Sequence, residues 1–590
     1  MAPTEYVIRP IDPLGHYFEV DLIIWRPQAM QEVQMPAWIP GSYMIRDFSR
    51  QVVSIHAYEI NEKHHLISPL VVDAVDSNSW KIHTTQKPIL IRSKIYAFDT
   101  SVRAAYLDQY RGFFNHTSLC LQAIGWTDSP SLVHIEKQDW MNTWSLITSM
   151  NPKRVSKNGF GTYFVNDYDE LIDHPVSLGH FQIIHWKSFG IHHHMVIQGA
   201  TELIDTAKLE KDLKAITQAH IAFFEPDTQQ APFKQYIFHV NASANGYGGL
   251  EHRSSTALLC KRSDLPYKNL VTQQNAYEDF LGLCSHEYFH AWNVKNIQPA
   301  AFQPYDLQNR NHTQLLWLFE GFTSYYDDLQ LIRSGVISLD VYLERLSKTI
   351  NLVLSTSGRL KQSVAQSSFD AWTKYYIVDE NTPNTVVSYY AKGSLIALAL
   401  DLLIRQFTKY QKSLDDVMVG LWNKHGNLKD IGSGITENGF RDVVLEVIGK
   451  DFKSSWNQFE KKYITGTDDL PLKELFEANQ WSLVESPFSG SELALQRFGI
   501  RTIAQDAWVK VTHVLDHGSA HLAGLAAGDL LVSMNRERIT PSNLNALLER
   551  FSGKSIQVML FRQDVLHNCV IEKDERHFSK WTVRSPQPTT

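Results

Sequence analysis

The chain has 590 residues and a mass of 67.6 kDa, too long for one hydrophobic core, and this length indicates three or four domains. Hydrophobic residues make up 43% of the chain, which is enough to bury large cores. The formal net charge of −7 and the pI near 6.4, without any Lys/Arg run, argue against a nucleic-acid-binding protein.

Cysteine usage and the N-terminus favour a cytoplasmic protein. The four cysteines contain no Cys-x-x-Cys, so they predict neither a disulfide framework nor a thiolate zinc site. No signal peptide is visible at the N-terminus, although a trimmed precursor would leave a periplasmic or secreted location open. No run approaches 18 apolar residues, so we expect no membrane span.

Residues 1–172 are predicted to form an all-β domain. Strand-like runs such as residues 17–25 and 94–98 alternate between apolar and polar side chains, and Pro36, Pro40 and Gly41 punctuate the chain between them. Because helical periodicity is absent, a β-sandwich is the expected fold. We expect such a domain to pack against a catalytic unit or to shape its substrate site.

From residue 173 the pattern becomes mixed. Residues 193–198 and 235–240 are strand-like, with a helix predicted over 208–224 between them. The triplet of histidines at 192–194 cannot converge on a metal, since neighbouring strand residues point to opposite faces. The glycines at 245–252 permit close backbone approach to a ligand, but the segment lacks the features of a phosphate loop.

The next segment contains His-Glu-x-x-His at residues 286–290. A helix is predicted from Thr272 to about Lys295, because the run contains no proline and its apolar residues share one face. His286, Glu287 and His290 fall on the opposite face, where histidines at i and i+4 can hold one metal ion. With 25 histidines in the chain such a pentapeptide arises by chance fairly often, so it needs a third ligand and a substrate pocket.

Two further helices carry candidate site residues. A helix over residues 313–333 contains Glu320 between Phe319 and Phe322, where a carboxylate is costly unless it is neutral, paired or bound to a metal. A strongly apolar helix running to about residue 404 begins near Tyr389 and Tyr390, which places these tyrosines at a domain interior or cleft. Helical periodicity continues to residue 461, so the catalytic unit should carry a helical lobe.

The C-terminal part is predicted to be a small separate module. Strands are expected at 508–511 and 556–560 and a helix at 541–551, with glycine-rich turns between them. The last residues, 585–590, are expected to be a loose tail.

Three separated motifs point to one family. His-Glu-x-x-His at 286–290 with Glu320 resembles the thermolysin-like zinc peptidases whose third ligand is Glu. Gly-Gly-Leu-Glu-His at 248–252 resembles the Gly-x-Met-Glu-Asn strand of the aminopeptidase N-like enzymes, and Tyr-Ala-Lys-Gly at 390–393 matches their Tyr-x-Lys-Gly. With Trp-Ile-Pro-Gly-Ser-Tyr at 38–43, nearly the whole chain resembles the glycyl aminopeptidase family.

The resemblance implies a multidomain α+β architecture. Residues 1–172 would form the N-terminal β-sandwich-like domain, 173–482 a thermolysin-like catalytic domain with a helical lobe, and 483–584 a PDZ-like domain, followed by the tail at 585–590. One departure concerns spacing: Glu320 lies 30 residues after His290, farther than in the aminopeptidase N-like enzymes. The additional residues fall in the loop between the two helices, so the helix pairing could be preserved.

The resemblance also implies a reaction. One Zn²⁺ per chain would be held by His286, His290 and Glu320, with the fourth position open to water. The ion would lower the pKa of that water, and Glu287 would act as general base. The substrates would be peptides with a free N-terminus, with a preference for small first residues, Gly and Ala.

The remaining implied roles concern the substrate. Tyr390 would stabilise the oxyanion, with Tyr389 as a substrate-binding residue and as the alternative to Tyr390. Glu251 would bind the α-ammonium of the substrate beside Gly248 and Gly249, which makes the enzyme an exopeptidase.

Two rival functions remain open from the sequence. One is a zinc endopeptidase, which would cut N-blocked peptides as well as free ones. The other is a peptide-binding scaffold with a vestigial peptidase domain, whose PDZ-like module captures a peptide C-terminus on backbone amides around Phe498, Gly499 and Ile500. The sequence does not identify the physiological substrate, the oligomeric state or the PDZ ligand.

Overall fold

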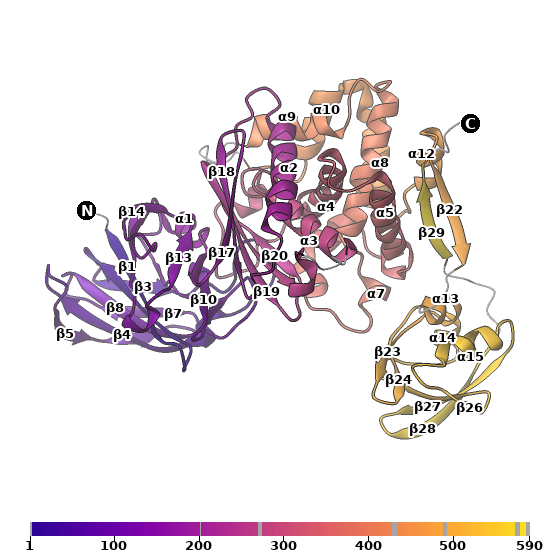
Figure 1. Cartoon of the computed structure of the whole chain (residues 1–590), viewed down its shortest axis with the longest axis horizontal. Coiled ribbons are helices and arrows are strands. Elements are labelled where there is room, and N and C mark those ends of the chain that lie inside the picture. Colours follow the sequence, from indigo (N-terminus) through magenta and orange to yellow (C-terminus); the bar gives the residue numbers. More distant parts are fainter. Residues whose placement is uncertain are drawn as a thin grey trace. The chain divides into compact units, whose positions relative to one another are not determined.

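The computed structural model describes residues 3–200, 202–268, 274–426, 434–487, 492–572 and 579–585 (Figure 1). Two compact units divide the chain. The first comprises Met1–Asn311, Gln330–Val336 and Leu421–Thr436, and the second comprises His312–Leu329, Ile337–Gly420 and Glu437–Thr590. Within the described ranges, no helix combines the length and the hydropathy that crossing a membrane requires. Thr272 and residues 586–590 of the expected tail lie outside the described residues.

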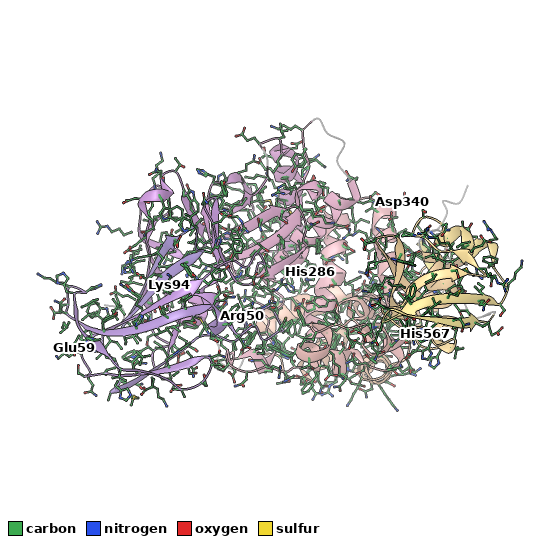
Figure 2. All side chains as sticks on the ribbon, turned by 90° about the horizontal axis from the view of Figure 1, so that it is seen from below. Arg50, Glu59, Lys94, His286, Asp340 and His567 are labelled. Carbon is green, nitrogen blue, oxygen red and sulfur yellow. The ribbon has the colours of Figure 1, made fainter. Side chains whose placement is uncertain are left out.

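The N-terminal part of the first unit is rich in β-structure, as predicted. An eight-stranded sheet has the order β14-β15-β12-β1-β2-β8-β4-β5, and two four-stranded sheets have the orders β13-β16-β10-β9 and β11-β3-β7-β6. Glu59 on β4 and Lys94 on β8 are two residues of the large sheet (Figure 2). The strands are β1 (Thr4–Asp12), β2 (Tyr17–Ile24), β3 (Met30–Gln34), β4 (Val52–Ile60), β5 (Leu66–Leu70), β6 (Val72–Ala74), β7 (Ser79–His83), β8 (Ile89–Tyr96), β9 (Ala105–Leu107), β10 (Arg111–Phe114), β11 (Gln122–Ala123), β12 (Ser131–Ile135), β13 (Ser145–Thr148), β14 (Asn151–Val155), β15 (Gly161–Val165) and β16 (Val176–Gly179).

A five-stranded sheet with the order β17-β18-β19-β21-β20 follows in the same unit. The short helix α1 (Tyr168–Ile172) precedes it in the chain. The helix α2 packs against β17, α3 packs against β20 and β21, and the two helices pack on each other, so both cover one face. The elements are β17 (Gln182–Ser188), β18 (Ile191–Gln198), α2 (Thr206–Phe224), β19 (Gln235–Ser243), β20 (Gly248–Glu251), β21 (Ser255–Lys261) and α3 (Gln274–Phe289).

The side chains of the three histidines on β18 alternate between the two faces of the strand, as predicted. His193 is completely buried, and its Nε2 lies 2.8 Å from the hydroxyl of Tyr288 on α3. The rings of His192 and His194 stack on each other on the other face of the strand. The prediction that the three side chains cannot converge is therefore confirmed.

Helices make up most of the second unit up to residue 478. They are α4 (Leu316–Arg333), α5 (Leu339–Leu354), α6 (Val364–Phe369), α7 (Thr382–Thr385), α8 (Ala391–Phe407), α9 (Leu414–His425), α10 (Gly439–Ile448), α11 (Lys453–Phe459) and α12 (Leu472–Ala478), with a π-helical turn at Ala371–Tyr375. The end of α4 and the end of α9 belong to the first unit. The predicted helical lobe is confirmed as a helical region.

The C-terminal part is a β-rich module with its own core. Residues such as Phe498, Val511, Leu531 and Leu548 form a hydrophobic cluster that contains no residue of the helical lobe. Its elements are α13 (Leu493–Phe498), β23 (Ile500–Gln505), β24 (Trp508–Val514), α14 (Ser519–Leu522), β25 (Leu530–Met534), β26 (Glu537–Arg538), α15 (Leu544–Arg550), β27 (Ile556–Arg562) and β28 (Val565–Ile571). The order β23-β24-β25-β27-β28, with β26 beside β25, forms a single sheet.

Two strands on either side of this module pair with each other. β22 (Ser482–Pro487) runs antiparallel to β29 (Ser579–Arg584) as a two-stranded sheet (Figure 1). β29 in turn lies against α5: Asn351 exchanges two side-chain hydrogen bonds with the backbone of Trp581, and the backbone N–H of Val583 donates to the Ser347 hydroxyl at 2.9 Å. The pair of strands therefore attaches the module to the helical lobe.

Candidate metal centre and substrate site

His286 lies on the last turn of α3, and His290 directly follows the end of this helix at Phe289. The backbone N–H of His290 donates to the carbonyl of His286 at 3.3 Å, and the two Nε2 atoms lie 3.1 Å apart. Nδ1 of His290 lies 2.7 Å from the Asn293 carbonyl and donates its proton there, so Nε2 carries the lone pair that can bind a metal. His290 is buried, while His286, which Figure 2 labels, is half-buried.

The site helix is shorter than predicted. It ends at Phe289 rather than near Lys295, because the chain turns sharply after the motif. The carbonyls of Phe289 and His290 accept hydrogen bonds from the N–H groups of Asn293 and Lys295. These tight turns satisfy carbonyls that a longer helix would have used and place Asn293 where it can orient His290.

Glu320 of α4 completes a set of three ligands. The candidate ligand atoms of His286, His290 and Glu320 all lie within 4.8 Å of one another, and Glu320 is 2% exposed. A tetrahedral zinc with bonds of about 2.0–2.1 Å separates two ligand nitrogens by roughly 3.3 Å, close to the distance between the two Nε2 atoms. Two imidazoles and one carboxylate are also the donors of a catalytic zinc, so these residues fit the metal.

The carboxylate of Glu287 lies directly over the backbone of β20. A methyl group placed on Gly249 would fall 2.1 Å from Oε1 of Glu287, which is far inside van der Waals contact. While Glu287 keeps this position, the backbone of β20 has no room for a side chain at residue 249. The motif glutamate and the glycine-rich strand are therefore parts of one site.

We expect Gly249→Ala to lower kcat/KM by about a hundredfold, because a displacement of about 1 Å of a catalytic group can cost that much. The added carbon must push away either Glu287 or β20. Steady-state kinetics with an amino-acid anilide measures the loss, and zinc content should stay near the wild-type value. Gly190→Ala is the control for the added carbon alone: nothing lies within 4 Å of it, and the strain of alanine at a φ of +85° is confined to the turn between β17 and β18. Full activity of Gly249→Ala would contradict this contact.

Glu251 is a buried carboxylate at the end of β20. It is 4% exposed, and among the described residues no hydrogen bond reaches its Oε1 atom. Gly41, with a φ of +92°, packs on it, since a methyl group there would lie 2.6 Å from Oε2. A buried carboxylate oxygen without a partner is costly, which makes Glu251 a candidate receptor for a cation.

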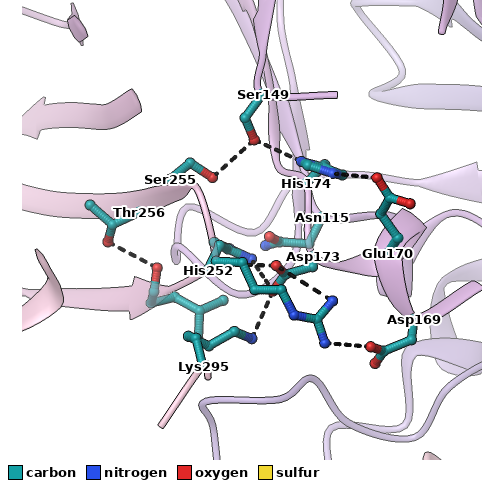
Figure 3. A network of polar contacts seen from close by, with 12 residues as sticks. Asn115, Ser149, Asp169, Glu170, Asp173, His174, His252, Ser255, Thr256 and Lys295 are labelled. Carbon is teal, nitrogen blue, oxygen red and sulfur yellow. Dashed lines mark hydrogen bonds and ion pairs between the residues drawn. The ribbon is translucent and has the colours of Figure 1, made fainter. Parts of the chain in front are cut away.

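A buried network of charges anchors the chain directly after Glu251 (Figure 3). Asp173 accepts from Lys295 at 2.7 Å and from the backbone N–H of Arg253 at 2.9 Å, and it lies 3.5 Å from Nδ1 of His252. Burial acts to raise the pKa of Asp173, but the charges of Lys295 and Arg253 outweigh burial and hold it well below its ordinary value. Asp173 is thus a permanent anion that fixes the turn following Glu251.

The two candidate tyrosines lie at the start of α8. Tyr389 is completely buried, whereas Tyr390 is partly exposed. Their rings stack at 4.7 Å with 28° between the planes, so the two side chains pack side by side and differ in exposure. The hydroxyl of Tyr390 lies 3.1 Å from that of Tyr376, and the ring of Tyr375 stacks on Tyr390 and packs at a tilt against Tyr389.

The other residues of the Tyr-Ala-Lys-Gly motif have structural roles. Lys392 is 1% exposed, and its ammonium donates to the carbonyls of Arg359 and Asp468 at 3.3 Å each. Burial lowers its pKa to about 8. Gly393 lies against Gly321, where an added methyl group would approach the partner's Cα to within 2.8 Å, so α4 and α8 cross with their backbones in contact.

The sequence reasoning missed three positioning residues. The guanidinium of Arg103 donates to the Gly249 carbonyl at 3.1 Å and so holds β20 in place. Gly41 packs on Glu251, and Gly321 follows the metal ligand Glu320 and packs on Gly393. Gly41 stands inside the motif at 38–43 and Gly321 directly follows Glu320, so the sequence offers a signal for both, but nothing near Arg103 in the sequence marks it.

Two protein families and several solved structures match this chain. Residues 279–396 match the M61 glycyl aminopeptidase family, and residues 5–180 match the peptidase M61 N-terminal domain. The structure of an aminopeptidase N family protein from Idiomarina loihiensis is similar at 36% identity, with a TM-score of 0.93 and coverage of 99% of this chain and 98% of that chain. An M1 zinc metallopeptidase structure from Deinococcus radiodurans matches at 10% identity, with a TM-score of 0.47 over 79% of this chain and 94% of that chain. A search of curated proteins found no match.

Metal-dependent peptidases are the class that this fold and these three ligands define. Because the family matches cover both the catalytic helices and the N-terminal domain, and the identity extends over the full length, the chain belongs to the M61 glycyl aminopeptidase family. It is a zinc metallo-aminopeptidase, a hydrolase of peptide bonds.

Proposed function

We propose that this enzyme removes small N-terminal residues, Gly and Ala, from peptides with a free N-terminus, using water activated at one zinc ion. The observation that carries the proposal is Glu251, a carboxylate buried to all but 4% with no hydrogen bond to Oε1 within the described part of the chain. The α-ammonium of a substrate would provide the positive charge and the N–H donors that Oε1 of Glu251 lacks. The internal residues of a longer peptide have no such cation, so Glu251 selects chain ends.

The position of β20 at the edge of its sheet also supports the proposed aminopeptidase function. β20 pairs with β21 and forms one edge of its sheet, and it carries Gly248, Gly249 and Glu251. An extended peptide can align along such an edge through backbone hydrogen bonds. The glycines keep side chains out of the way, so the first peptide bond of the substrate can lie close to Glu287.

In the proposed mechanism each side chain has one task. His286, His290 and Glu320 would hold the zinc ion, which would supply Lewis acidity to lower the pKa of water and polarise the substrate carbonyl. Glu287 accepts the proton of the attacking water and transfers it to the leaving amine. The hydroxyl of Tyr390 donates a hydrogen bond to the carbonyl oxygen as that atom gains negative charge.

Tyr390 is preferred to Tyr389 for this task because its side chain is partly exposed, whereas Tyr389 is completely buried. Tyr389 supports the ring of Tyr390 by stacking and remains the proposed neighbour of the substrate. The preference for small residues is supported by the description of the family as glycyl aminopeptidases.

The proposed architecture assigns residues 1–172 to a β-sandwich-like domain, 173–482 to a thermolysin-like catalytic domain, and 483–584 to a PDZ-like domain. The separate core and the single sheet of the C-terminal module support the last assignment. Capture of a peptide C-terminus around Phe498 and Gly499 stays a prediction; the N–H of Gly499 is already bonded to the Leu495 carbonyl. The cytoplasmic location also stays a prediction.

The test compares amino-acid anilides that have free and acetylated N-termini. We expect Glu251→Gln to raise KM for Ala-anilide by about 10- to 100-fold, the range expected for a lost hydrogen bond to a charged group, with little change in zinc content. Glu210→Gln, an exposed position on α2, is the control and should behave as wild type. Equal cleavage of free and acetylated substrates by the wild type would identify an endopeptidase instead. A wild type that binds zinc but hydrolyses no peptide would favour the scaffold function.

A further inference from the structure

An apolar pocket of about 300 Å³ lies in the second unit beside the candidate catalytic tyrosines. One wall comes from the end of α5 with Leu352 and Val353, and another comes from Val378, Val386 and Val387. Leu352 and Val378 are 53% and 70% exposed, so they form an open apolar rim. Exposed apolar side chains around a concavity are typical of a binding surface.

The pocket is continuous with the Tyr390 segment. Tyr375 and Ser388 both line it, and their hydroxyls lie 3.0 Å apart. Tyr375 stacks on Tyr390 at 5.6 Å, and Ser388 directly precedes the two tyrosines. A ligand in the pocket is therefore one aromatic ring away from the hydroxyl that we assign to the oxyanion.

Arg501 of the C-terminal module contributes the one cation of the pocket lining. Its side chain is half-buried, and no described carboxylate forms an ion pair with it. Partial desolvation by burial lowers the pKa of its guanidinium below the ordinary value, and no counterion from the described residues compensates for it. An arginine in this state is a strong receptor for a carboxylate.

The position of Arg501 is fixed by the fold rather than by a loose contact. Arg501 on β23 pairs with His513 on β24, next to Val514 at the end of that strand. The buried side chain of Asn384 donates to the Val514 carbonyl at 2.9 Å and accepts from the Asp516 N–H at 2.9 Å. These two hydrogen bonds join the module to the segment that also forms the pocket wall.

We propose that this pocket binds the C-terminal side of short peptide substrates, with an apolar C-terminal side chain against Val378 and Leu352 and the terminal carboxylate on Arg501. The inference rests on the proposed aminopeptidase function and specifies its substrate class: short peptides that end in a free carboxylate and an apolar residue. The C-terminal module would thereby contribute to substrate selection, because its Arg501 binds the carboxylate at the far end of the peptide. Charge complementarity and the apolar rim together identify the occupant.

The experiment uses Ala-(Gly)n-Leu peptides of increasing length, each as the free acid and as the C-terminal amide. For the zinc-loaded wild type we expect one length at which the acid has a KM about tenfold lower than the amide, from the charged hydrogen bonds to Arg501. Arg501→Gln should abolish this difference by raising KM for the acid, with kcat unchanged. Arg501→Lys should retain part of it, and Arg538→Gln, at an exposed position on β26, should leave it intact.

Val378→Asp provides a second test that keeps Arg501 in place. The new carboxylate at an exposed rim position should repel the acid peptides and raise their KM, but it should spare the amides. If Arg501→Gln and Val378→Asp leave the acid-to-amide ratio at the wild-type value, the pocket is not the site. If the wild type cleaves none of the peptides, the proposed function fails and the pocket assignment fails with it.

Discussion

Glu287→Gln is expected to lower kcat by about a thousandfold, within the range for loss of a general base, while zinc stays bound at about one ion per chain. Glutamine keeps the size of the side chain, so the contact above Gly249 survives. The amide cannot accept the proton from water at neutral pH, and only proton transfer is lost. Turnover of Ala-anilide and elemental analysis of the same sample measure the two quantities together.

The control for this variant is Glu278→Gln, on the same helix. Glu278 is also buried, at 5% exposed, but it accepts a hydrogen bond from Gln274 one turn away and belongs to no part of the site. It should retain activity. If Glu287→Gln turns over at a rate near that of the wild type, Glu287 is not the base. If it loses zinc as well, its role is in holding the metal centre.

Glu320→Ala should remove the metal as well as the activity. A change beside the ligands commonly costs 10- to 100-fold in metal affinity, so loss of a ligand itself should cost more than about a hundredfold. We expect dialysed protein to contain less than a tenth of the wild-type zinc. Glu320→Gln, which keeps the volume of the buried side chain, separates loss of the ligand from formation of a cavity.

Asp327 and Asp328 are the alternative ligands on the same helix. Asp328 accepts a hydrogen bond from Arg345 at 2.6 Å, and neither residue belongs to the described cluster of three ligands. Asp328→Asn should therefore keep its zinc. Unchanged zinc in Glu320→Ala together with zinc loss in Asp328→Asn would move the third ligand by two turns of α4.

Much of the site was predictable because its candidate metal ligands stand in short, recognisable sequence motifs. His286 and His290 stand one helical turn apart, so the sequence alone places their rings together. Glu320 stands out as a carboxylate in an apolar run, where burial without a partner would be costly. The elements around these residues also follow from their periodicity, and α2, β18, β19 and α8 were predicted to within a few residues.

What the sequence could not supply are contacts between distant segments. Gly41 and Glu251 are 210 positions apart, yet a methyl group on one would overlap the carboxylate of the other. Arg103 and Gly249 form a similar long-range pair, and no periodicity predicts it. The end of α3 was also misjudged, because turns stabilised by Asn293 and Lys295 replace a helix that propensity alone would have continued.

The stacked tyrosines illustrate a different limit. Tyr389 and Tyr390 lie at the entry to a helix, where successive side chains are about 100° apart, so sequence position alone does not separate their environments. Tyr375, on its π-helical turn, fills the space beside both rings. The choice between the two tyrosines therefore depends on exposure, a quantity that only the packed structure provides.

The pairing of β22 with β29 has an evolutionary consequence. Pro487 at the end of β22 pairs with Ser579 at the start of β29, so the two strands that flank the module lie side by side, and β29 is secured on α5. Exchange of the module by recombination would leave a two-stranded hairpin and an intact catalytic core behind. Such a junction lets a lineage of enzymes acquire a new recognition module in one genetic event, while the residues that carry out hydrolysis stay under separate selection.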